Sequence, residues 1–306
     1  MEEKICVIIP ARGRAEKIER CIRSILEVRY PKTEIIIVDD GLGGDPLRLL
    51  DNFKDRIKIF KSGLKGPSYA RNLAAKNTDA PLLAFTDSDC IVDREWLTEL
   101  TKGLQEYPDA VSCGGAQKIP DDASAFEKRV YLFMKNVGFV TDYMRGSGGE
   151  EVIEVNHNAS CNVMYKREAF LKENGFMEGL WPGEDVEFDY RLRKKGYRIV
   201  FNPKAIVYHY RPDDIKKFSD MMYRYGKVQA LLVKKYGFFR KIHLVPLSFF
   251  LLLSLLVLAC LRIEFFGIAV LVPAILIALA FDFIRFLFIT LFSWNWGFLR
   301  GLFSNK

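Results

Sequence analysis

The stretch Pro81-Leu-Leu-Ala-Phe-Thr-Asp-Ser-Asp89 joins a short apolar run to two carboxylates that lie two residues apart. A continuous apolar run of this length predicts a strand that is buried on both faces of a sheet. The stretch Glu34-Ile-Ile-Ile-Val-Asp-Asp40 has the same form, and shorter apolar runs occupy residues 5–9 and 57–60. The sequence therefore predicts four buried strands, two of which end directly in acidic residues.

Helical patterns lie between these strands. Apolar residues recur at helical spacing after the first strand, at Ile18, Cys21, Ile22, Ile25 and Leu26, and residues 67–76 form a second helical stretch. Strands that alternate with helices predict an α/β fold with a mostly parallel sheet, whose ligands bind beyond the carboxyl ends of the strands. We assign this pattern to one domain over residues 1–211.

The excess of positive charge is confined to the last third of the chain. Of the formal net charge of +7, +5 lies in residues 212–241 and +2 in residues 242–306, so residues 1–211 are neutral. A nucleic-acid-binding protein carries its basic patch on the folded domain, so we predict no nucleic-acid partner. The six cysteines are at least 15 residues apart, which excludes a Cys-x-x-Cys zinc framework and fits free thiols in a reducing compartment.

Residues 212–241 predict a basic amphipathic helix. Apolar residues recur at helical spacing, at Ile215, Phe218, Met222, Tyr225 and Leu232. Lysines and an arginine lie between them. Basic side chains next to an anionic membrane leaflet contribute about 1 kcal/mol each to its binding, so we expect a juxtamembrane helix. The alternative is an ordinary helix with a solvated basic face.

Three apolar segments follow in residues 242–306, which we assign as a transmembrane region. Residues 244–261 and 265–281 carry no charge, and each approaches the ~20 residues needed to cross a bilayer. Residues 283–299 contain Arg285, Trp294 and Trp296, and they either span the membrane or lie in its interface. The alternative for these segments is a set of buried core helices.

The flanking charges predict an orientation. Four basic residues precede the first apolar segment, at Lys234, Lys235, Arg240 and Lys241, and basic flanks stay on the cytoplasmic side. The first residues of the chain lack the basic start and apolar core of a signal peptide. We therefore predict a multi-pass protein of the cell membrane with residues 1–211 in the cytoplasm, and a two-span hairpin would return the C-terminus to that side.

Two carboxylates at a strand end suit a hard divalent cation that shares phosphate oxygens with a substrate. Alone, Asp87-Ser-Asp89 is more often a capping turn. Four further motifs change that interpretation: Pro10-Ala-Arg12, Gly66-Pro-Ser-Tyr-Ala-Arg-Asn72, Asn158-Ala-Ser-Cys-Asn162 and Pro182-Gly-Glu-Asp-Val-Glu-Phe-Asp189. In this order and spacing, about residues 4–211 resemble an inverting glycosyltransferase of family 2 with the GT-A fold, the Rossmann-like mixed sheet of nucleotide-diphospho-sugar transferases.

The resemblance implies that five residues bind a nucleotide-sugar donor: Pro10, Arg12, Asp40, Arg71 and Asp87. Pro10 and Arg12 would border the base and Asp40 would hydrogen-bond it, while Arg71 would contact the nucleotide side and Asp87 the ribose.

The resemblance also implies a metal site and a catalytic base. Asp87 and Asp89 would ligate Mg²⁺ or Mn²⁺, and His209 is a candidate third ligand that is otherwise a packed strand histidine. Asp185 would be the catalytic base, with Glu184 orienting the acceptor, although acids here also cap a helix start.

The chemistry of sugar transfer fits these residue types. Attack on an anomeric carbon needs a deprotonated acceptor, which a carboxylate supplies, and a stabilised leaving diphosphate, which a divalent ion supplies. A phosphate acceptor is already anionic, so the Glu184-Asp185 pair indicates a hydroxyl. We therefore predict transfer of a single sugar from a nucleotide-diphosphate sugar to a hydroxyl of a lipid-linked or cell-envelope glycan acceptor.

Two alternatives stay open. One is a polyprenyl-phosphate sugar synthase, and the other is an inactive nucleotide-sugar-binding scaffold, against which the intact acids at 87, 89 and 185 argue. The chain also departs from family patterns. No glutamine begins the Gln-x-x-Arg-Trp motif of processive members, and Gly41-Leu-Gly-Gly-Asp45 replaces the usual Asp-Gly-Ser-x-Asp, so the donor base is not determined.

Overall fold

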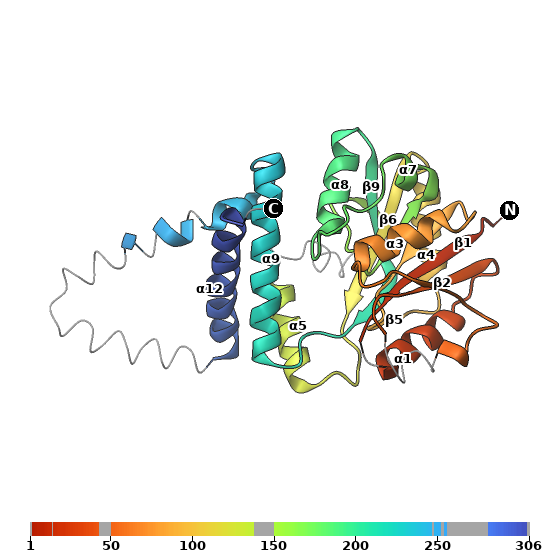
Figure 1. The fold of residues 1–306 in the computed structure, drawn as a ribbon, viewed down its shortest axis with the longest axis horizontal. Coiled ribbons are helices and arrows are strands. Elements are labelled where there is room, and N and C mark those ends of the chain that lie inside the picture. The colour runs from red at the N-terminus through yellow and green to blue at the C-terminus, as the bar shows by residue number, and fades with distance from the viewer. Residues whose placement is uncertain are drawn as a thin grey trace. The chain divides into compact units, whose positions relative to one another are not determined.

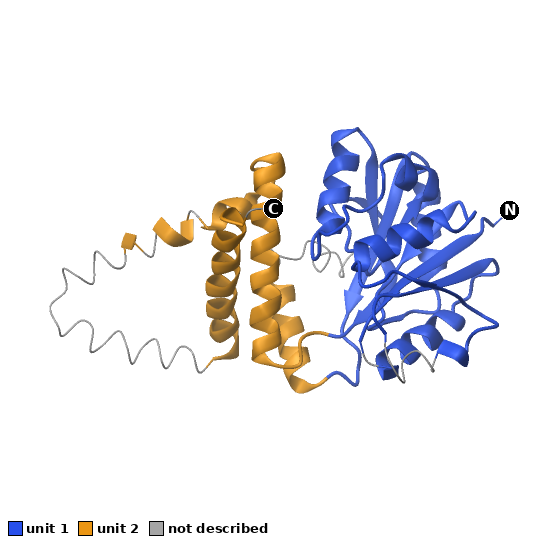
Figure 2. Ribbon diagram, in the orientation of Figure 1, with its two compact units in different colours: residues 1–123, 141–210 blue, residues 124–140, 211–306 orange. Residues whose placement is uncertain are grey.

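The computed structural model describes residues 2–13, 15–42, 50–137, 150–246, 248–251, 254–255 and 281–304. Within these ranges the chain forms two compact units (Figure 2). The sheet unit comprises residues 1–123 and 141–210, and the helical unit comprises residues 124–140 and 211–306.

The sheet unit is built on one nine-stranded sheet, whose first strands are coloured red to orange in Figure 1. In chain order its strands are β1 (Ile5–Ala11), β2 (Thr33–Asp39), β3 (Lys58–Lys61), β4 (Leu82–Phe85), β5 (Cys90–Val92), β6 (Ala110–Lys118), β7 (Ile153–Glu154), β8 (Val163–Lys166) and β9 (Arg198–His209). Their order in space is β3-β2-β1-β4-β8-β6-β9-β5, and β7 also pairs with β9. All four strands predicted from apolar runs are confirmed.

The sheet is mixed, as the predicted fold class requires. β3, β2, β1 and β4 are parallel neighbours, whereas β8 is antiparallel to both β4 and β6. β9 runs parallel to β6 and antiparallel to β5, so Cys90 and His209 are paired residues on adjacent strands. These pairings bring the ends of β1, β2 and β4 to one edge, and they bring the end of β9 next to the start of β5.

Helices cover both faces of the sheet. Side chains alternate along β1, so that Ile5, Val7 and Ile9 pack with α1 (Ala15–Leu26) and α4 (Trp96–Glu106). Cys6 and Ile8 point to the other face, which is covered by α3 (Pro67–Lys76), α7 (Arg167–Lys172) and α8 (Glu184–Lys194). The helices predicted at residues 18–26 and 67–76 are therefore present, and both bury their apolar stripe on the sheet.

A cluster of aromatic rings packs α8 against β4, β8 and α7. Its members are Phe85, Tyr165, Phe170, Phe176 and Phe188, and neighbouring ring centroids lie 5.0–6.1 Å apart. Every one of these side chains is almost fully buried. Burial of each large apolar side chain contributes about 1.5–3 kcal/mol, so this cluster fixes the start of α8 relative to β4 and β8.

The helical unit contains α5 (Ala125–Val137), α9 (Ile215–Tyr236), a short 3₁₀ helix at Lys241–Leu244 and α12 (Asp282–Leu302). Phe133 of α5 packs against Phe218 of α9 and Phe286 of α12. This helix, which lies within residues 1–211, is therefore part of the helical unit.

The amphipathic helix predicted in residues 212–241 exists as α9, but its apolar stripe packs against protein. Phe218, Met222 and Leu232 are buried, and a Cβ added at Gly226 would lie 1.8 Å from the carbonyl oxygen of Trp294 in α12. A Cβ added at Gly297 of α12 would lie 2.0 Å from the carbonyl oxygen of Tyr223 in α9. The apolar face of α9 therefore packs closely against α12, and the expected position of its basic side chains at an anionic leaflet stays a prediction.

The predicted membrane spans are largely untested by the structure. Residues 244–261 and 265–281 fall mostly outside the described residues. Among the residues that are described, no helix is both long enough and apolar enough to cross a bilayer, and this includes α12, which contains residues 283–299.

Candidate active site

The segments that leave β1, β2 and β4 lie side by side at one edge of the sheet. Ala11 is paired with Asp39 across β1 and β2, and the amide of Thr86 after β4 donates to the carbonyl of Ile8. The hydroxyl of Ser88 donates to the carbonyl of Arg12 at 3.2 Å, which joins two of these segments. Pro10 is buried and Arg12 is exposed at this edge. Their predicted contacts with a base stay predictions.

Asp40 holds the end of β2 against the loop that leads into α3. Its Oδ1 accepts hydrogen bonds from the Ser62 hydroxyl and, at 3.0 Å, from the amide of Gly66. Gly66 has a φ of 89°, a left-handed conformation that favours glycine, and Pro67 begins the helix directly after it. Asp40 is 2% exposed. Its predicted hydrogen bond to a base stays a prediction.

The three predicted metal ligands come together. Asp87 and Asp89 leave β4, His209 ends β9, and one ligand atom from each lies within 4.8 Å of the other two. The Nε2 atom of His209 is 3.4 Å from Oδ1 of Asp89. All three side chains are partly exposed, so a cation and a substrate phosphate have access to them. Two carboxylates and an imidazole are a donor set that divalent Mg²⁺ or Mn²⁺ accepts.

Asp87, Asp89 and His209 together form the acidic trio. Arg71 of α3 connects this acidic trio to the start of α8. Its guanidinium donates to Asp87 at 2.5 Å and to Glu184 at 2.7 Å, and it lies over the ring of Phe176. The side chain is 2% exposed. Burial opposes its charge, but the two carboxylates more than compensate and raise the pKa of Arg71 above its ordinary value. The contact with the nucleotide side that the resemblance implies for Arg71 stays a prediction beside this bridge between two acids.

The Glu184-Asp185 pair is held by the first turn of α8 and by Ser160. The Ser160 amide donates to Asp185 at 3.0 Å, while its hydroxyl donates to Glu184 at 3.1 Å. Asp185 also accepts from the amide of Val186 at 2.8 Å and stays partly exposed, whereas Glu184 is buried. Two backbone amides therefore orient the Asp185 carboxylate, and each of its oxygens retains a further lone pair for a proton.

Glu184 is the acid whose proton affinity the fold changes most clearly. Burial raises the pKa of Glu184 to about 7, because the ion pair with Arg71 offsets only part of the desolvation cost and Asp185 adds repulsion. One guanidinium here faces the three carboxyl groups of Asp87, Glu184 and Asp185, so a proton is most easily kept on the most buried one. Perturbation of this kind is typical of active sites.

The motifs assign no role to two further polar residues, Ser160 and Asp189. Ser160 lies in Asn158-Ala-Ser160, a sequon-like triplet that carried no assigned role. Asp189, one turn beyond Asp185, is fully buried and accepts from Tyr165 and from the amide of Asn158, and His157 contacts it at 3.1 Å. A run of polar residues at 157–162 directly before a buried strand was the available signal.

Comparison with known proteins assigns the family. Residues 6–172 match the model of glycosyl transferase family 2. The chain belongs to this family. A dolichyl N-acetyl-alpha-D-glucosaminyl phosphate 3-beta-D-2,3-diacetamido-2,3-dideoxy-beta-D-glucuronosyltransferase of Methanococcus voltae is 25% identical, over 99% of this chain and 98% of that protein. A glucosyl-dolichyl phosphate glucuronosyltransferase of Haloferax volcanii is 24% identical over 68% of this chain and 69% of its own length.

A solved structure has a similar fold. The mannosyltransferase PcManGT from Pyrobaculum calidifontis, in complex with GDP-Man and Mn²⁺, superposes with a TM-score of 0.76 at 16% identity. The match covers 100% of this chain and 89% of that chain. The family model confirms the family 2 glycosyltransferase predicted from the motifs, and this structure supports its mixed α/β sheet.

Proposed function

We propose that this glycosyltransferase moves a single sugar from a nucleoside-diphosphate sugar to a hydroxyl of a lipid-linked saccharide. The observation that carries the proposal is the position of Arg71, whose guanidinium is bonded to both Asp87 and Glu184. Asp87 belongs to the trio suited to a cation, and Glu184 is adjacent to the proposed base. Groups for stabilising the leaving diphosphate and for activating the nucleophile therefore meet around one buried side chain.

Asp185 is the proposed base. Its carboxylate is partly exposed, is oriented by the amides of Ser160 and Val186, and accepts the proton of the acceptor hydroxyl as the new glycosidic bond forms. Glu184 is buried behind it and holds Arg71 and Ser160 in place, so it acts as a positioning residue.

Asp87, Asp89 and His209 would hold a divalent cation. When bound, Mg²⁺ or Mn²⁺ supplies neutralisation of the charge that develops on the leaving diphosphate. The carboxylate-rich donor set supports either ion, and the Mn²⁺ in the PcManGT complex makes manganese the first ion to test. Arg71 donates to one carboxylate oxygen of Asp87, which leaves the other oxygen available to the cation.

The names of the relatives favour a sugar hydroxyl over a free lipid phosphate. Both archaeal relatives are named for acceptors in which a sugar is already attached to dolichyl phosphate. Such an acceptor presents a hydroxyl, which needs a base, and Asp185 is available for that role. A polyprenyl-phosphate sugar synthase stays the second candidate, since its acceptor shares the lipid but offers a phosphate.

A donor and acceptor screen tests the proposal. Purified full-length protein is incubated with a panel of nucleoside-diphosphate sugars and Mn²⁺, and release of nucleoside diphosphate is measured with either a polyprenyl-phosphate-linked saccharide or free polyprenyl phosphate. We expect release with one donor, dependent on the saccharide acceptor and abolished by excess chelator and by Asp89→Ala. Preference for free polyprenyl phosphate would establish the second candidate, and full turnover in excess chelator would refute the role of the cation.

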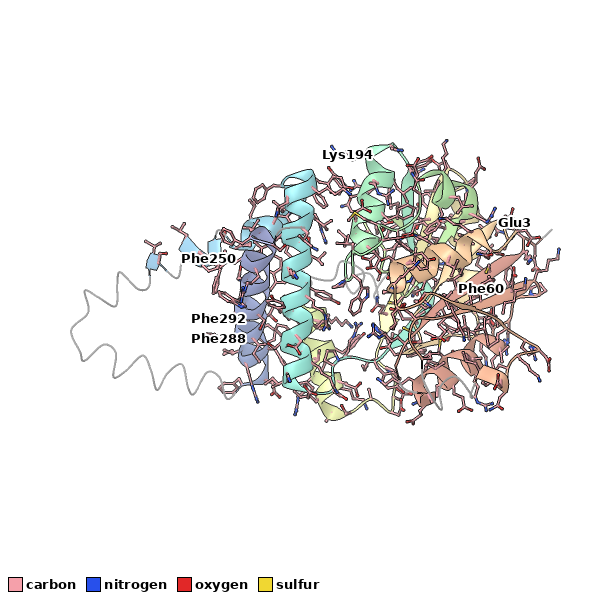
Figure 3. All side chains as sticks on the ribbon, viewed as in Figure 1. Glu3, Phe60, Lys194, Phe250, Phe288 and Phe292 are labelled. Carbon is pink, nitrogen blue, oxygen red and sulfur yellow. The ribbon has the colours of Figure 1, made fainter. Side chains whose placement is uncertain are left out.

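The proposed place of action is the cytoplasmic face of the cell membrane. Exposed aromatic side chains recur every four residues along α12, at Phe288, Phe292 and Trp296, and the first two are labelled in Figure 3. Aromatic side chains of this kind favour a lipid interface, and the basic residues from Lys234 to Lys241 favour an anionic leaflet. Protease accessibility of a C-terminal tag in sealed vesicles tests the proposed hairpin, and a tag on the external side would refute it.

A further inference from the structure

A second group of metal-binding side chains adjoins the acidic trio. The thiols of Cys90 and Cys161 and a ring nitrogen of His209 all lie within 4.8 Å of one another. Cys90 is the strand partner of His209, whereas Cys161 comes from the polar segment before β8. Both cysteines are buried, with 0% and 5% exposure, and each is a free thiol.

The spacing fits a tetrahedral ion after a small adjustment. Zinc binds thiolate sulfur at about 2.3 Å and imidazole nitrogen at about 2.0–2.1 Å, which separates neighbouring ligand atoms by ~3.5–3.8 Å. Ligand atoms that already lie within 4.8 Å need to move by only about an ångström to reach this arrangement. A set of two cysteines and one histidine leaves the fourth position open for water, as zinc sites with three protein ligands do.

The two groups differ in the ions they prefer but share one ligand. Thiolates select soft ions such as Zn²⁺ and Cd²⁺, whereas the carboxylates of Asp87 and Asp89 suit Mg²⁺ or Mn²⁺. We propose that Cys90, Cys161 and His209 form a second, thiophilic metal site that competes with the acidic trio for the imidazole of His209. Binding of one Zn²⁺ or Cd²⁺ displaces the two thiol protons to solvent, forms two metal–sulfur bonds and leaves the oxidation state of every atom unchanged.

Cadmium titration of the full-length protein tests the site without any sugar donor. The protein is stripped of metal, kept in a phosphine reductant so that no disulfide can form, and titrated with Cd²⁺ while the ultraviolet thiolate-to-cadmium absorption is recorded. We expect saturation at one Cd²⁺ per chain with the absorption of two thiolates. Cys90→Ala and Cys161→Ala should each weaken binding by more than the about 10–100-fold that loss of an outer partner costs.

One cysteine provides a matched control. Cys113 is buried in β6 outside the cluster, so Cys113→Ala should leave the titration unchanged. Circular dichroism confirms that each variant is folded, and Cys161→Ala, in a loop rather than a strand, keeps the test available if Cys90→Ala does not fold. Absence of the absorption in the wild type, or its persistence in Cys161→Ala, would overturn the proposal.

The competition rests on the proposed function and has a separate readout. Zn²⁺ added to a Mn²⁺-dependent transfer reaction should inhibit the wild type, and Cys161→Ala should become at least tenfold less sensitive. If Zn²⁺ inhibited the wild type and Cys161→Ala equally while the cadmium absorption was present, only the sharing of His209 would be refuted. If the protein had no transferase activity, the proposed function would be refuted and the cadmium-binding result would still hold.

Discussion

The sheet unit buries charged side chains, whereas the helical unit buries glycines where two helices meet. In the sheet unit Arg71, Glu184 and Asp189 are at most 2% exposed, and each is held by polar partners. In the helical unit Gly226 and Gly297 bring helix backbones into contact, without any charge. A buried ion pair is a costly way to stabilise a fold, whereas close helix contact is not. The difference indicates that the buried charges are retained for chemistry and the glycines for packing.

The largest expected effect is on catalysis in the sheet unit. Asp185→Asn should lower turnover by about 10²–10⁴-fold, because the amide cannot accept the proton of the acceptor hydroxyl. Nucleoside diphosphate release measures turnover, and calorimetry should show unchanged donor binding, since the base faces the acceptor. Asp213→Asn, an exposed acid of the helical unit, serves as the control. Near wild-type turnover of Asp185→Asn would contradict the assignment of the base.

Removal of the buried guanidinium should affect stability as well as activity. Arg71→Met leaves Asp87 and Glu184 without their cation, and loss of one partner of a buried ion pair costs about 3–5 kcal/mol in the free energy of unfolding. Denaturant unfolding measures this loss.

The control is Arg198→Met, which removes an exposed arginine that pairs with Asp109 and Glu154 in the same unit. Exposed pairs contribute about 0–1 kcal/mol, so this variant should stay close to the wild type. Equal losses in the two variants would show that the burial of Arg71 has no special cost.

The helical unit should respond to added volume rather than to lost charge. Gly226→Ala places a methyl group 1.8 Å from the carbonyl oxygen of Trp294, so the backbones of α9 and α12 must separate. Overpacking of this kind costs about 1–3 kcal/mol. Hydrogen exchange should rise in α9 and α12 while the sheet unit keeps its protection. Asp220→Ala, at an exposed position of α9, should change little, and unaltered exchange in Gly226→Ala would refute the close contact.

The last expected effect is a change in how stability depends on pH. The pKa of Glu184 is raised from 4.5 to about 7 by burial, so the folded state binds its proton more tightly than the unfolded state does. This contribution is fully present below pH 4.5 and is lost as the pH rises through about 7, at up to about 1.4 kcal/mol per pH unit.

Glu184→Gln removes that titration. The free energy of unfolding of the wild type, measured between pH 5 and pH 7, should therefore fall more steeply than that of the variant. Glu27→Gln alters an exposed pair with Arg94 and should keep the wild-type slope. Identical slopes in the wild type and Glu184→Gln would mean that Glu184 is ionised throughout this range.

Local sequence patterns were sufficient to predict these strands and helices and the protein family. The apolar runs before Asp39 and Asp87 became β2 and β4, and the motif around Pro67 became α3 with Gly66 before it. The hydrophobic period and the residues that cap a helix depend only on neighbours a few residues apart, so both can be recognised in the sequence. The same locality explains why the sequence does not show what covers α9, since its apolar stripe has one period whether a lipid surface or α12 covers it.

By itself, the sequence determined which segments form strands and helices, that Asp87 and Asp89 end a buried strand, and that the chain is a family 2 glycosyltransferase. The tertiary structure alone decided which distant side chains meet. Arg71 and Glu184 are 113 residues apart, and Cys90, Cys161 and His209 share no motif at all. Their contacts follow from the strand order, which places β4 between β1 and β8 and β9 beside β5. Strand order depends on how two sheet faces bury their apolar side chains together, and no local window of sequence contains that information.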